Sequence, residues 1–141
     1  MNLQEKAKKI LLRKKEYREL TNSEKNNLIL VFAENGKVIH KRAFDLVRIK
    51  KEIDFSDKKS IEKNLSSITL IEMKATDRDL DKNFSKYFFG ITMRELILAQ
   101  SFKKQYRFIF VNVNSRYTLE LGLPEVFAKI KQFDLVVHTK F

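Results

Sequence analysis

Apolar and polar residues along the chain follow two periods, one typical of helices and one typical of strands. The first twenty residues have the helical period and predict an amphipathic helix over residues 2–20. The apolar face of this helix would carry Leu3, Ala7, Ile10, Leu11 and Leu20. The opposite face would carry Lys6, Lys8, Lys9, Arg13, Lys14, Lys15 and Arg18. A basic face of this kind suits contact with a phosphate backbone and, equally, an ordinary solvated surface. A membrane-surface helix is less favoured.

A second helix is predicted over residues 22–34. Thr21 and Glu24 have the spacing of a capping box, and Gly36 stands where such a helix would end. The pair Asn35-Gly36 is also typical of a hairpin turn between two apolar stretches, and we favour the helix slightly.

The rest of the chain alternates between strand-like and helix-like segments. The predicted strands are residues 44–49, 68–75, 106–113, 117–121 and 135–139. One further helix is predicted from the capping box at Thr92 and Glu95 to about Lys104, and another from Pro124 to about Gln132. Residues 50–66 are polar and predict a long loop with at most one helical turn. Helices and strands therefore interleave, which predicts an α/β fold with a central mixed β-sheet flanked by helices.

Composition limits the domain count and the chemistry. A chain of 141 residues is the size of one domain, so residues 1–141 are expected to form a single unit. There is no cysteine, which excludes disulfides, a thiol nucleophile and cysteine-ligated metals. The two histidines, His40 and His138, are far apart in sequence, which argues against a histidine-rich metal site.

The net charge of +11 comes from 29 basic against 18 acidic residues and favours a polyanionic partner. Charge alone does not distinguish nucleic acid from an anionic membrane. No apolar run approaches the roughly 20 residues of a spanning helix, and the N-terminus lacks the apolar core of a secretory signal. We therefore expect a cytoplasmic protein that binds nucleic acid and no membrane.

The segment Leu70 to Thr76 holds the strongest candidate chemistry. On a strand, Glu72 and Lys74 share one face, while Ile71 and Met73 point to the other. The face that begins with apolar residues therefore becomes charged toward the end of the strand. These two side chains either line a site or form a surface ion pair of little energetic value.

A second acid, Asp45, lies in an apolar run on the preceding predicted strand. A carboxylate in such a run is costly unless it is paired, bound to a metal or satisfied by backbone donors at the strand end. If the two strands are neighbours, Asp45 and Glu72 could hold a divalent cation, since Mg²⁺ prefers oxygen ligands and often uses one or two carboxylates. Lys74 would then lie beside the cation and orient or activate the attacking water.

At these residues the sequence resembles the PD-(D/E)XK, or restriction-endonuclease-like, nuclease superfamily. Its pattern is an acid on one strand and acid-x-Lys on the next, here Asp45 and then Glu72-Met73-Lys74. A later part of the chain resembles restriction-related families and the nuclease-like domain named after the plant protein NO VEIN. The residues that carry this resemblance are Phe84, residues 87–92, Glu95, Ala99 and the strand from Tyr106. The resemblance covers residues 34–113. It implies that Asp45 and Glu72 bind Mg²⁺ or Mn²⁺ and that Lys74 assists phosphodiester hydrolysis.

Other residues compete for these roles or could join them. Phe44 stands where the family has proline, and the long charged spacer offers Asp54, Asp57 and Glu62 as rival acids, ranked lower because they lie in a loop-like stretch. Glu34 could join the metal site, as an acid does in some relatives, although such a residue is more often helix surface. Gln100 could face the site as an accessory residue, and an ordinary exposed position is favoured.

The nucleic-acid contacts are expected from basic residues outside the acids. The candidates are Lys86, Arg94 and, on the first helix, Lys8, Lys9, Arg13, Lys14 and Lys15. Lys103 and Lys104 could also contact phosphates, and a solvated face explains them equally well. The aromatic run Tyr87-Phe88-Phe89 could stack on bases, and we favour a core position for Phe88 or Phe89.

The predicted function is a Mg²⁺-dependent endonuclease that hydrolyses DNA, in restriction, repair or mobile-element biology, with RNA not excluded. The alternative is a non-catalytic nucleic-acid-binding module on the same fold, and a third hypothesis is a structural protein that is basic by chance. A free-standing restriction enzyme of this length is expected to form a homodimer in order to cut both strands.

Overall fold

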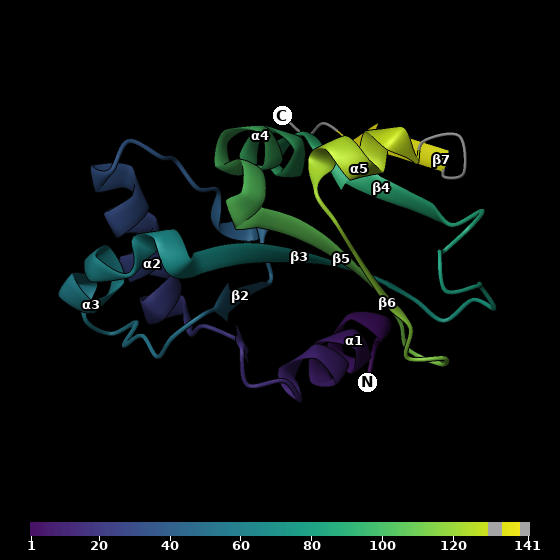
Figure 1. Ribbon diagram of the computed structural model, residues 1–141, viewed down its shortest axis with the longest axis horizontal. Coiled ribbons are helices and arrows are strands. Elements are labelled where there is room, and N and C mark those ends of the chain that lie inside the picture. The colour runs from purple at the N-terminus through teal and green to yellow at the C-terminus, as the bar shows by residue number, and fades with distance from the viewer. Residues whose placement is uncertain (130–133, 139–141) are drawn as a thin grey trace.

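The computed structural model describes residues 1–129 and the backbone of residues 134–138. Its centre is a five-stranded mixed sheet (Figure 1). The strands are β1 (Tyr17–Arg18), β2 (Leu46–Ile49), β3 (Ile68–Thr76), β5 (Tyr106–Asn112) and β6 (Thr118–Leu121), in the spatial order β1-β2-β3-β5-β6. Strand β3 is antiparallel to β2 and parallel to β5. Strands β4 (Phe88–Thr92) and β7 (Asp134–His138) form a separate parallel pair. The predicted single-domain α/β fold is confirmed.

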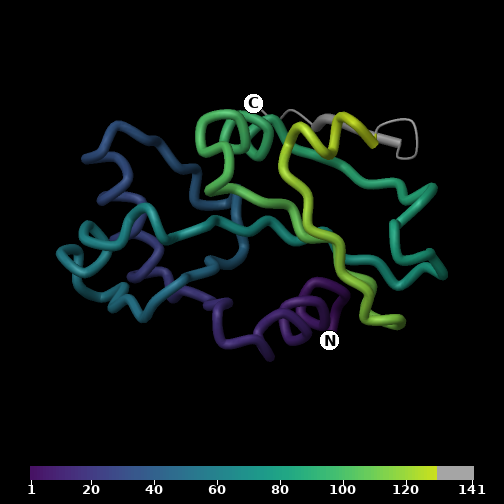
Figure 2. Tube along the Cα trace, viewed as in Figure 1, coloured from purple at the N-terminus to yellow at the C-terminus, as the bar shows by residue number. Residues whose placement is uncertain are grey.

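Helices cover both faces of the sheet. Helix α1 (Leu3–Leu12) lies on one face, and α4 (Met93–Phe102) and α5 (Leu123–Ala128) lie on the other with β4 (Figures 1 and 2). Helices α2 (Asn22–Glu34) and α3 (Lys58–Lys63) pack together at one end. The short 3₁₀ turns are η1 (Lys41–Ala43), η2 (Leu65–Ser67) and η3 (Lys103–Gln105). The long connection from β3 to the parallel β5 runs through β4 and α4, so α4 lies over the sheet near the end of β3.

The two predicted capping boxes are both present. The Thr21 side chain accepts from the Glu24 backbone N–H and the Glu24 carboxylate accepts from the Thr21 N–H, and Thr92 and Glu95 make the same exchange. These bonds satisfy backbone N–H groups that the first helical turn leaves without partners. The favoured helix over residues 22–34 is confirmed, and the hairpin alternative at Asn35-Gly36 is wrong.

The predicted N-terminal helix is too long. Helix α1 ends at Leu12, and Tyr17–Arg18 pair with Val47–Arg48 of β2 as an edge strand. The helical period continues through residue 20 in the sequence, but pairing with β2 stabilises the extended backbone instead. Ala7 and Leu11 pack on the α1 side of the sheet, whereas Leu20 belongs to the core on the opposite side.

The aromatic segment before α4 is mainly core. Phe84, Tyr87 and Phe89 are buried around Phe110 of β5, with ring centroids 4.8 to 6.1 Å from it. The favoured core position is confirmed for Phe89, while Phe88 on the opposite face of β4 is 53% exposed. Edge-to-face contacts of this kind add to the stabilisation from burial and fix β4 above the sheet.

The last two predicted elements are described only in part. Helix α5 ends at Ala128, and the remainder of its predicted range, at residues 130–132, lies outside the described residues. Strand β7 matches the predicted last strand through His138, and Thr139 lies outside as well. Within the described part of the chain, no helix is both long and apolar enough to cross a membrane.

Candidate active site

Strand β3 presents Glu72 and Lys74 on the face covered by α2 and α4. The side chains of Ile71 and Met73 point the other way, into the core beneath α1. Leu70, on the Glu72 face, belongs to the larger core. The predicted change from an apolar to a charged face along β3 is therefore present, and it places Glu72 at the border of the core with 5% of its surface exposed.

Asp45 lies opposite Glu72, immediately before β2. Leu46 pairs with Ile71 in the antiparallel ladder, so Asp45, one residue earlier, lies opposite Glu72, one residue later. The Asp45 backbone N–H donates to the Ile71 carbonyl at 2.8 Å, and Oδ2 of Asp45 accepts from the Met73 N–H at 2.8 Å. A backbone donor at the strand end thus satisfies one carboxylate oxygen, and the Asp45 carboxyl group also hydrogen-bonds to the Glu72 side chain.

Burial raises the pKa of Glu72 well above its ordinary value of 4.5. The hydrogen bond to Asp45, the charge of Asp45 and the charge of Glu95 raise it further, and the charge of Lys74 opposes them. Burial and the two neighbouring acids therefore favour the protonated form of the Glu72 carboxyl group. A divalent cation would replace that proton.

The ammonium of Lys74 is paired with Glu95, at 2.7 Å between Nζ and Oε1. The exposed fractions of the two side chains are 14% and 7%, so the surface ion-pair interpretation of Glu72 and Lys74 is wrong. The same Oε1 accepts from the backbone N–H of Thr92 at 3.2 Å. The capping-box spacing in the sequence predicts a capping role for Glu95 and no contact with Lys74. Its carboxylate also orients Lys74 and acts on Glu72.

Two further residues surround the acids. Tyr106 of β5 is fully buried and donates a 2.5 Å hydrogen bond to the carbonyl of Ala43, two residues before Asp45. Burial raises the pKa of Tyr106, and the charges of Glu72 and the other two acids add to this. Lys25 of α2 donates at 3.3 Å to the carbonyl of Phe44, which is the residue next to Asp45. Burial lowers the pKa of Lys25.

Beyond Asp45 the edge of β3 is covered by side chains rather than by a strand. Gln4 of α1 donates to the Met73 carbonyl at 3.4 Å, and the Tyr87 hydroxyl donates to the Ala75 carbonyl at 3.2 Å. Backbone polar groups left without partners in the interior are costly, so these contacts satisfy β3 where β2 does not yet pair with it, before Leu46. Asp45 and Glu72 therefore lie at the start of β2, where the pairing of β3 with β2 stops.

Asp45 and Glu72 together supply a donor set that suits Mg²⁺. Both are oxygen ligands, and Mg²⁺ commonly binds one or two carboxylates and completes its shell with water and substrate phosphate. Among the described residues, no three Asp, Glu, His or Cys side chains are grouped to hold one metal ion. A cation at this position would depend on the two-carboxylate pair.

Glu34 is not close to this pair. Lys25 places the first turn of α2 beside Asp45, and Glu34 ends the same helix nine residues later, about 13 Å along its axis. Glu34 is exposed and borders a hollow with Lys58 and Glu62 of α3. Its candidate role as a metal ligand is therefore wrong because the axis of α2 leads away from the acids.

The remaining candidates also lie elsewhere. Gln100 is exposed and borders a cavity between α4 and α5 with Arg107 and Gly122, on another side of α4 from Glu95. The rival acids serve local structure: Asp54 and Asp57 accept backbone N–H groups around the start of α3, and Glu62 accepts from the side chain of Asn35.

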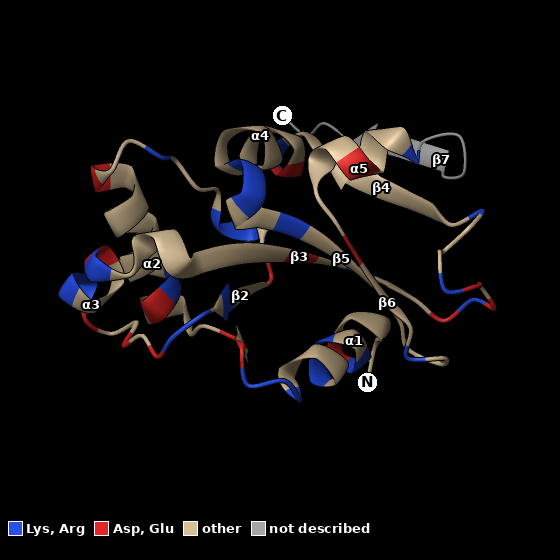
Figure 3. Cartoon of the chain, in the orientation of Figure 1, with Lys and Arg blue, Asp and Glu red and all other residues tan. Residues whose placement is uncertain are grey.

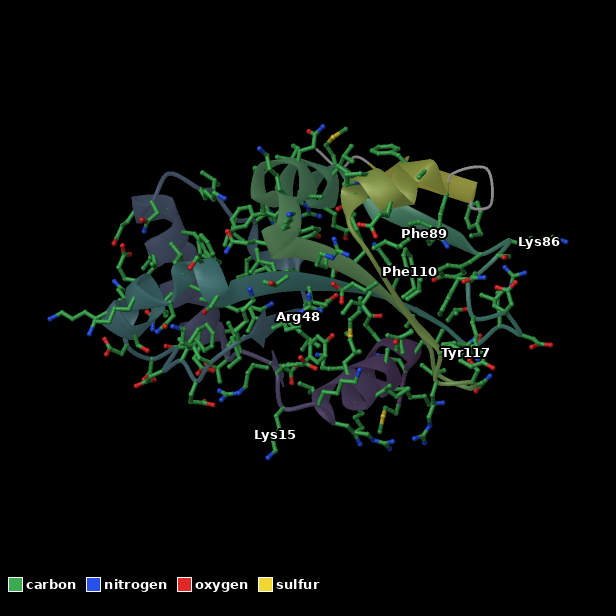
Figure 4. The ribbon with its side chains drawn as sticks, in the orientation of Figure 1. Lys15, Arg48, Lys86, Phe89, Phe110 and Tyr117 are labelled. Carbon is green, nitrogen blue, oxygen red and sulfur yellow. The ribbon has the colours of Figure 1, made fainter. Side chains whose placement is uncertain are left out.

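The basic residues do not form one continuous stripe. Lys and Arg are spread over most elements of the fold (Figure 3), and Lys15 and Lys86 project from different sides of the molecule (Figure 4). Lys8 forms an ion pair with Glu19, and Arg18 forms one with Glu52. Lys9, Arg13, Lys14, Lys103 and Lys104 are exposed, as are Lys15 and Lys86. Arg94 is half-buried, with Nη1 3.2 Å from Nε2 of His40.

Comparison with family models, with curated proteins and with solved structures finds no match to this chain. The resemblance to the restriction-endonuclease-like superfamily therefore remains a prediction from residues 34–113, and the functional conclusion depends on the geometry of the four charged side chains.

Proposed function

We propose that the protein is a metal-dependent endonuclease that hydrolyses phosphodiester bonds of DNA. One observation carries the proposal: the strand register places Asp45 opposite Glu72 on the border of the core, beside the ion pair of Lys74 and Glu95. Burying four ionisable groups together is costly for folding, and such clusters are most often found at functional sites.

Each charged group has a distinct task in such a reaction. Asp45 and Glu72 would hold Mg²⁺ or Mn²⁺, which supplies charge stabilisation at the phosphate and acidifies a water molecule. Lys74 would orient the attacking water and offset the negative charge that develops in the transition state. Glu95 fixes the direction of the Lys74 ammonium, so it is a positioning residue. Tyr106 holds the Ala43 carbonyl and, through it, the segment that carries Asp45.

DNA is the proposed partner, because a net charge of +11 favours phosphate backbones and two carboxylates alone would repel them. RNA has the same backbone chemistry, and the experiment includes it as a second substrate. A cytoplasmic location and a homodimer, which would allow both strands of a duplex to be cut, belong to the same proposal.

The test is incubation of the full chain with plasmid DNA, single-stranded DNA and RNA, each with Mg²⁺, Mn²⁺ or EDTA. We expect cleavage that requires the metal and that disappears in the Lys74→Ala, Glu72→Gln and Asp45→Asn variants. Binding of DNA by Lys74→Ala should stay close to that of the wild type, since one lysine among many contributes little to non-specific affinity.

Glu62→Gln is the matched control for Glu72→Gln, because it makes the same chemical change at an exposed position of α3. It should cleave at the wild-type rate. Absence of cleavage of every substrate by the wild-type protein would contradict the enzyme. Activity that falls only in step with binding would instead support the non-catalytic binding module.

A further inference from the structure

Lys25 occupies a position that is unfavourable for a cation. It lies in the first turn of α2, where the helix dipole is positive and a basic side chain is repelled. Burial and the charges of Lys8 and Lys41 disfavour its ammonium further. Of these two lysines, Lys41 belongs to η1, which packs against α2 and leads into Phe44 and Asp45.

The surroundings of Lys25 hold its ammonium in place without using all of its donors. The nitrogen lies 4.6 Å from the centre of the Phe44 ring and 3.3 Å from the Phe44 carbonyl. Within the described part of the chain, that carbonyl is the only acceptor that its hydrogen bonds reach. An ammonium has three N–H groups, so two remain for an acceptor that is not part of this fold.

The Phe44 carbonyl that Lys25 contacts belongs to the residue next to Asp45, so the ammonium lies close to the acids, whose charges raise its pKa. The Lys74 ammonium is instead paired with Glu95. The two lysines therefore have different positions. Lys74 belongs to the proposed reacting centre, and Lys25 lies next to that centre, together with the exposed Lys41.

We propose that Lys25, with Lys41 beside it, binds a backbone phosphate of the nucleic acid adjacent to the phosphate that faces Asp45 and Glu72. This inference rests on the proposed function for the identity of the ligand. It explains why a half-buried lysine occupies a helix start. A phosphate bound at this point would fix which phosphodiester bond lies over the two acids, because neighbouring phosphates of one strand have a fixed spacing.

The test measures binding rather than cleavage. Affinity for a duplex oligonucleotide is measured in EDTA over a series of salt concentrations, for the wild type, Lys25→Met, Lys25→Arg and Lys41→Met. Methionine keeps the apolar stem over Phe44 and removes the charge. Lys59→Met on α3 is the matched control, an exposed lysine remote from the acids.

Removing the lysine that neutralises one phosphate should reduce the slope of log affinity against log salt by about 0.9. We expect this reduction for Lys25→Met and for Lys41→Met, recovery in Lys25→Arg, and no change in Lys59→Met. An unchanged slope in Lys25→Met and Lys41→Met overturns the inference. If Lys25→Met fails to fold, Lys41→Met decides alone, since Lys41 is exposed.

The outcomes separate this inference from the proposed function. Metal-dependent cleavage by the wild type together with unchanged slopes in the variants would leave the nuclease intact and reject the phosphate site. Reduced slopes in Lys25→Met and Lys41→Met of a protein that cuts no substrate would support the phosphate site and reject the nuclease.

Discussion

The ammonium nitrogen of Lys74 lies 2.7 Å from Oε1 of Glu95, although one side chain comes from a strand and the other from the helix that crosses above it. Removing one partner of a buried ion pair leaves an uncompensated charge. Glu95→Gln should therefore lower the free energy of unfolding by about 3 kcal/mol at pH 7, measured by chemical denaturation.

The other capping box, formed by Thr21 and Glu24, provides the control for this prediction. Glutamine can still accept the cap N–H, so Glu24→Gln makes the same change at a box where the capping glutamate has no buried lysine partner among the described residues. Its cost should stay below about 0.5 kcal/mol. Equal losses in Glu24→Gln and Glu95→Gln would mean that capping, and not the pair with Lys74, accounts for the effect.

Glu72 gives the protein a characteristic dependence of stability on pH. Its pKa is raised in the folded state by burial, by Asp45 and by Glu95. Between its ordinary value of 4.5 and the raised value, the folded state binds more protons than the unfolded state, so stability falls as pH rises through this window. The stabilising effect of this proton is fully present below the ordinary pKa of 4.5 and is lost above the folded-state pKa.

Glu72→Gln should remove this component. In EDTA the variant is expected to be more stable than the wild type at about pH 8 and to show a smaller fall in stability between about pH 5 and pH 8, measured by denaturant titration. Its cation binding should be lost at the same time, because an amide is a poor replacement for a carboxylate ligand. Identical pH profiles for the two proteins would show that Glu72 is not held protonated.

Tyr106 tests how the loop that carries Asp45 is held. Tyr106→Phe leaves the Ala43 carbonyl without its 2.5 Å donor in a buried position, which should cost about 1–3 kcal/mol of stability. Tyr117→Phe, at a side chain that is 37% exposed, should cost less than about 0.5 kcal/mol. Metal-dependent cleavage should fall in Tyr106→Phe even at temperatures where the variant is fully folded. A rate equal to that of Tyr117→Phe would exclude a positioning role.

Local patterns in the sequence predict much of this arrangement. Alternation along β3 places Glu72 and Lys74 on one face, and the two capping boxes fix the starts of α2 and α4. The proximity of Asp45 to Glu72 follows once their strands are taken to be neighbours, as β2 and β3 are.

The errors have a common physical cause, since each depends on contacts between distant segments. Helix α1 ends early because Tyr17 pairs with Arg48, and the helical period of the first twenty residues contains no sign of that partner. The direction of α2, which carries Glu34 away from the acids, is likewise absent from any local pattern. Glu95 is recognisable as a cap, but its contact with Lys74 depends on how α4 crosses over β3.

The exposed basic residues after α1 are the best test of charge-driven binding. Deleting residues 1–20 would remove Ala7 and Leu11 from the core, so weaker binding by that truncation would not separate charge from folding. Replacing Arg13, Lys14 and Lys15 by glutamine removes three exposed charges and leaves both core residues in place.

We expect the triple variant to bind duplex DNA more weakly and to reduce the salt slope by roughly 3, about 0.9 for each phosphate that is no longer neutralised. The control removes the same charge from α3, by glutamine at Lys58, Lys59 and Lys63, which are exposed and lie at the other end of the fold. Both proteins should unfold at the wild-type temperature. Equal slopes in the two triple variants would mean that total charge, rather than the segment after α1, governs affinity. A smaller slope only for the variant with glutamine at Arg13, Lys14 and Lys15 would place the phosphate backbone along residues 13–15.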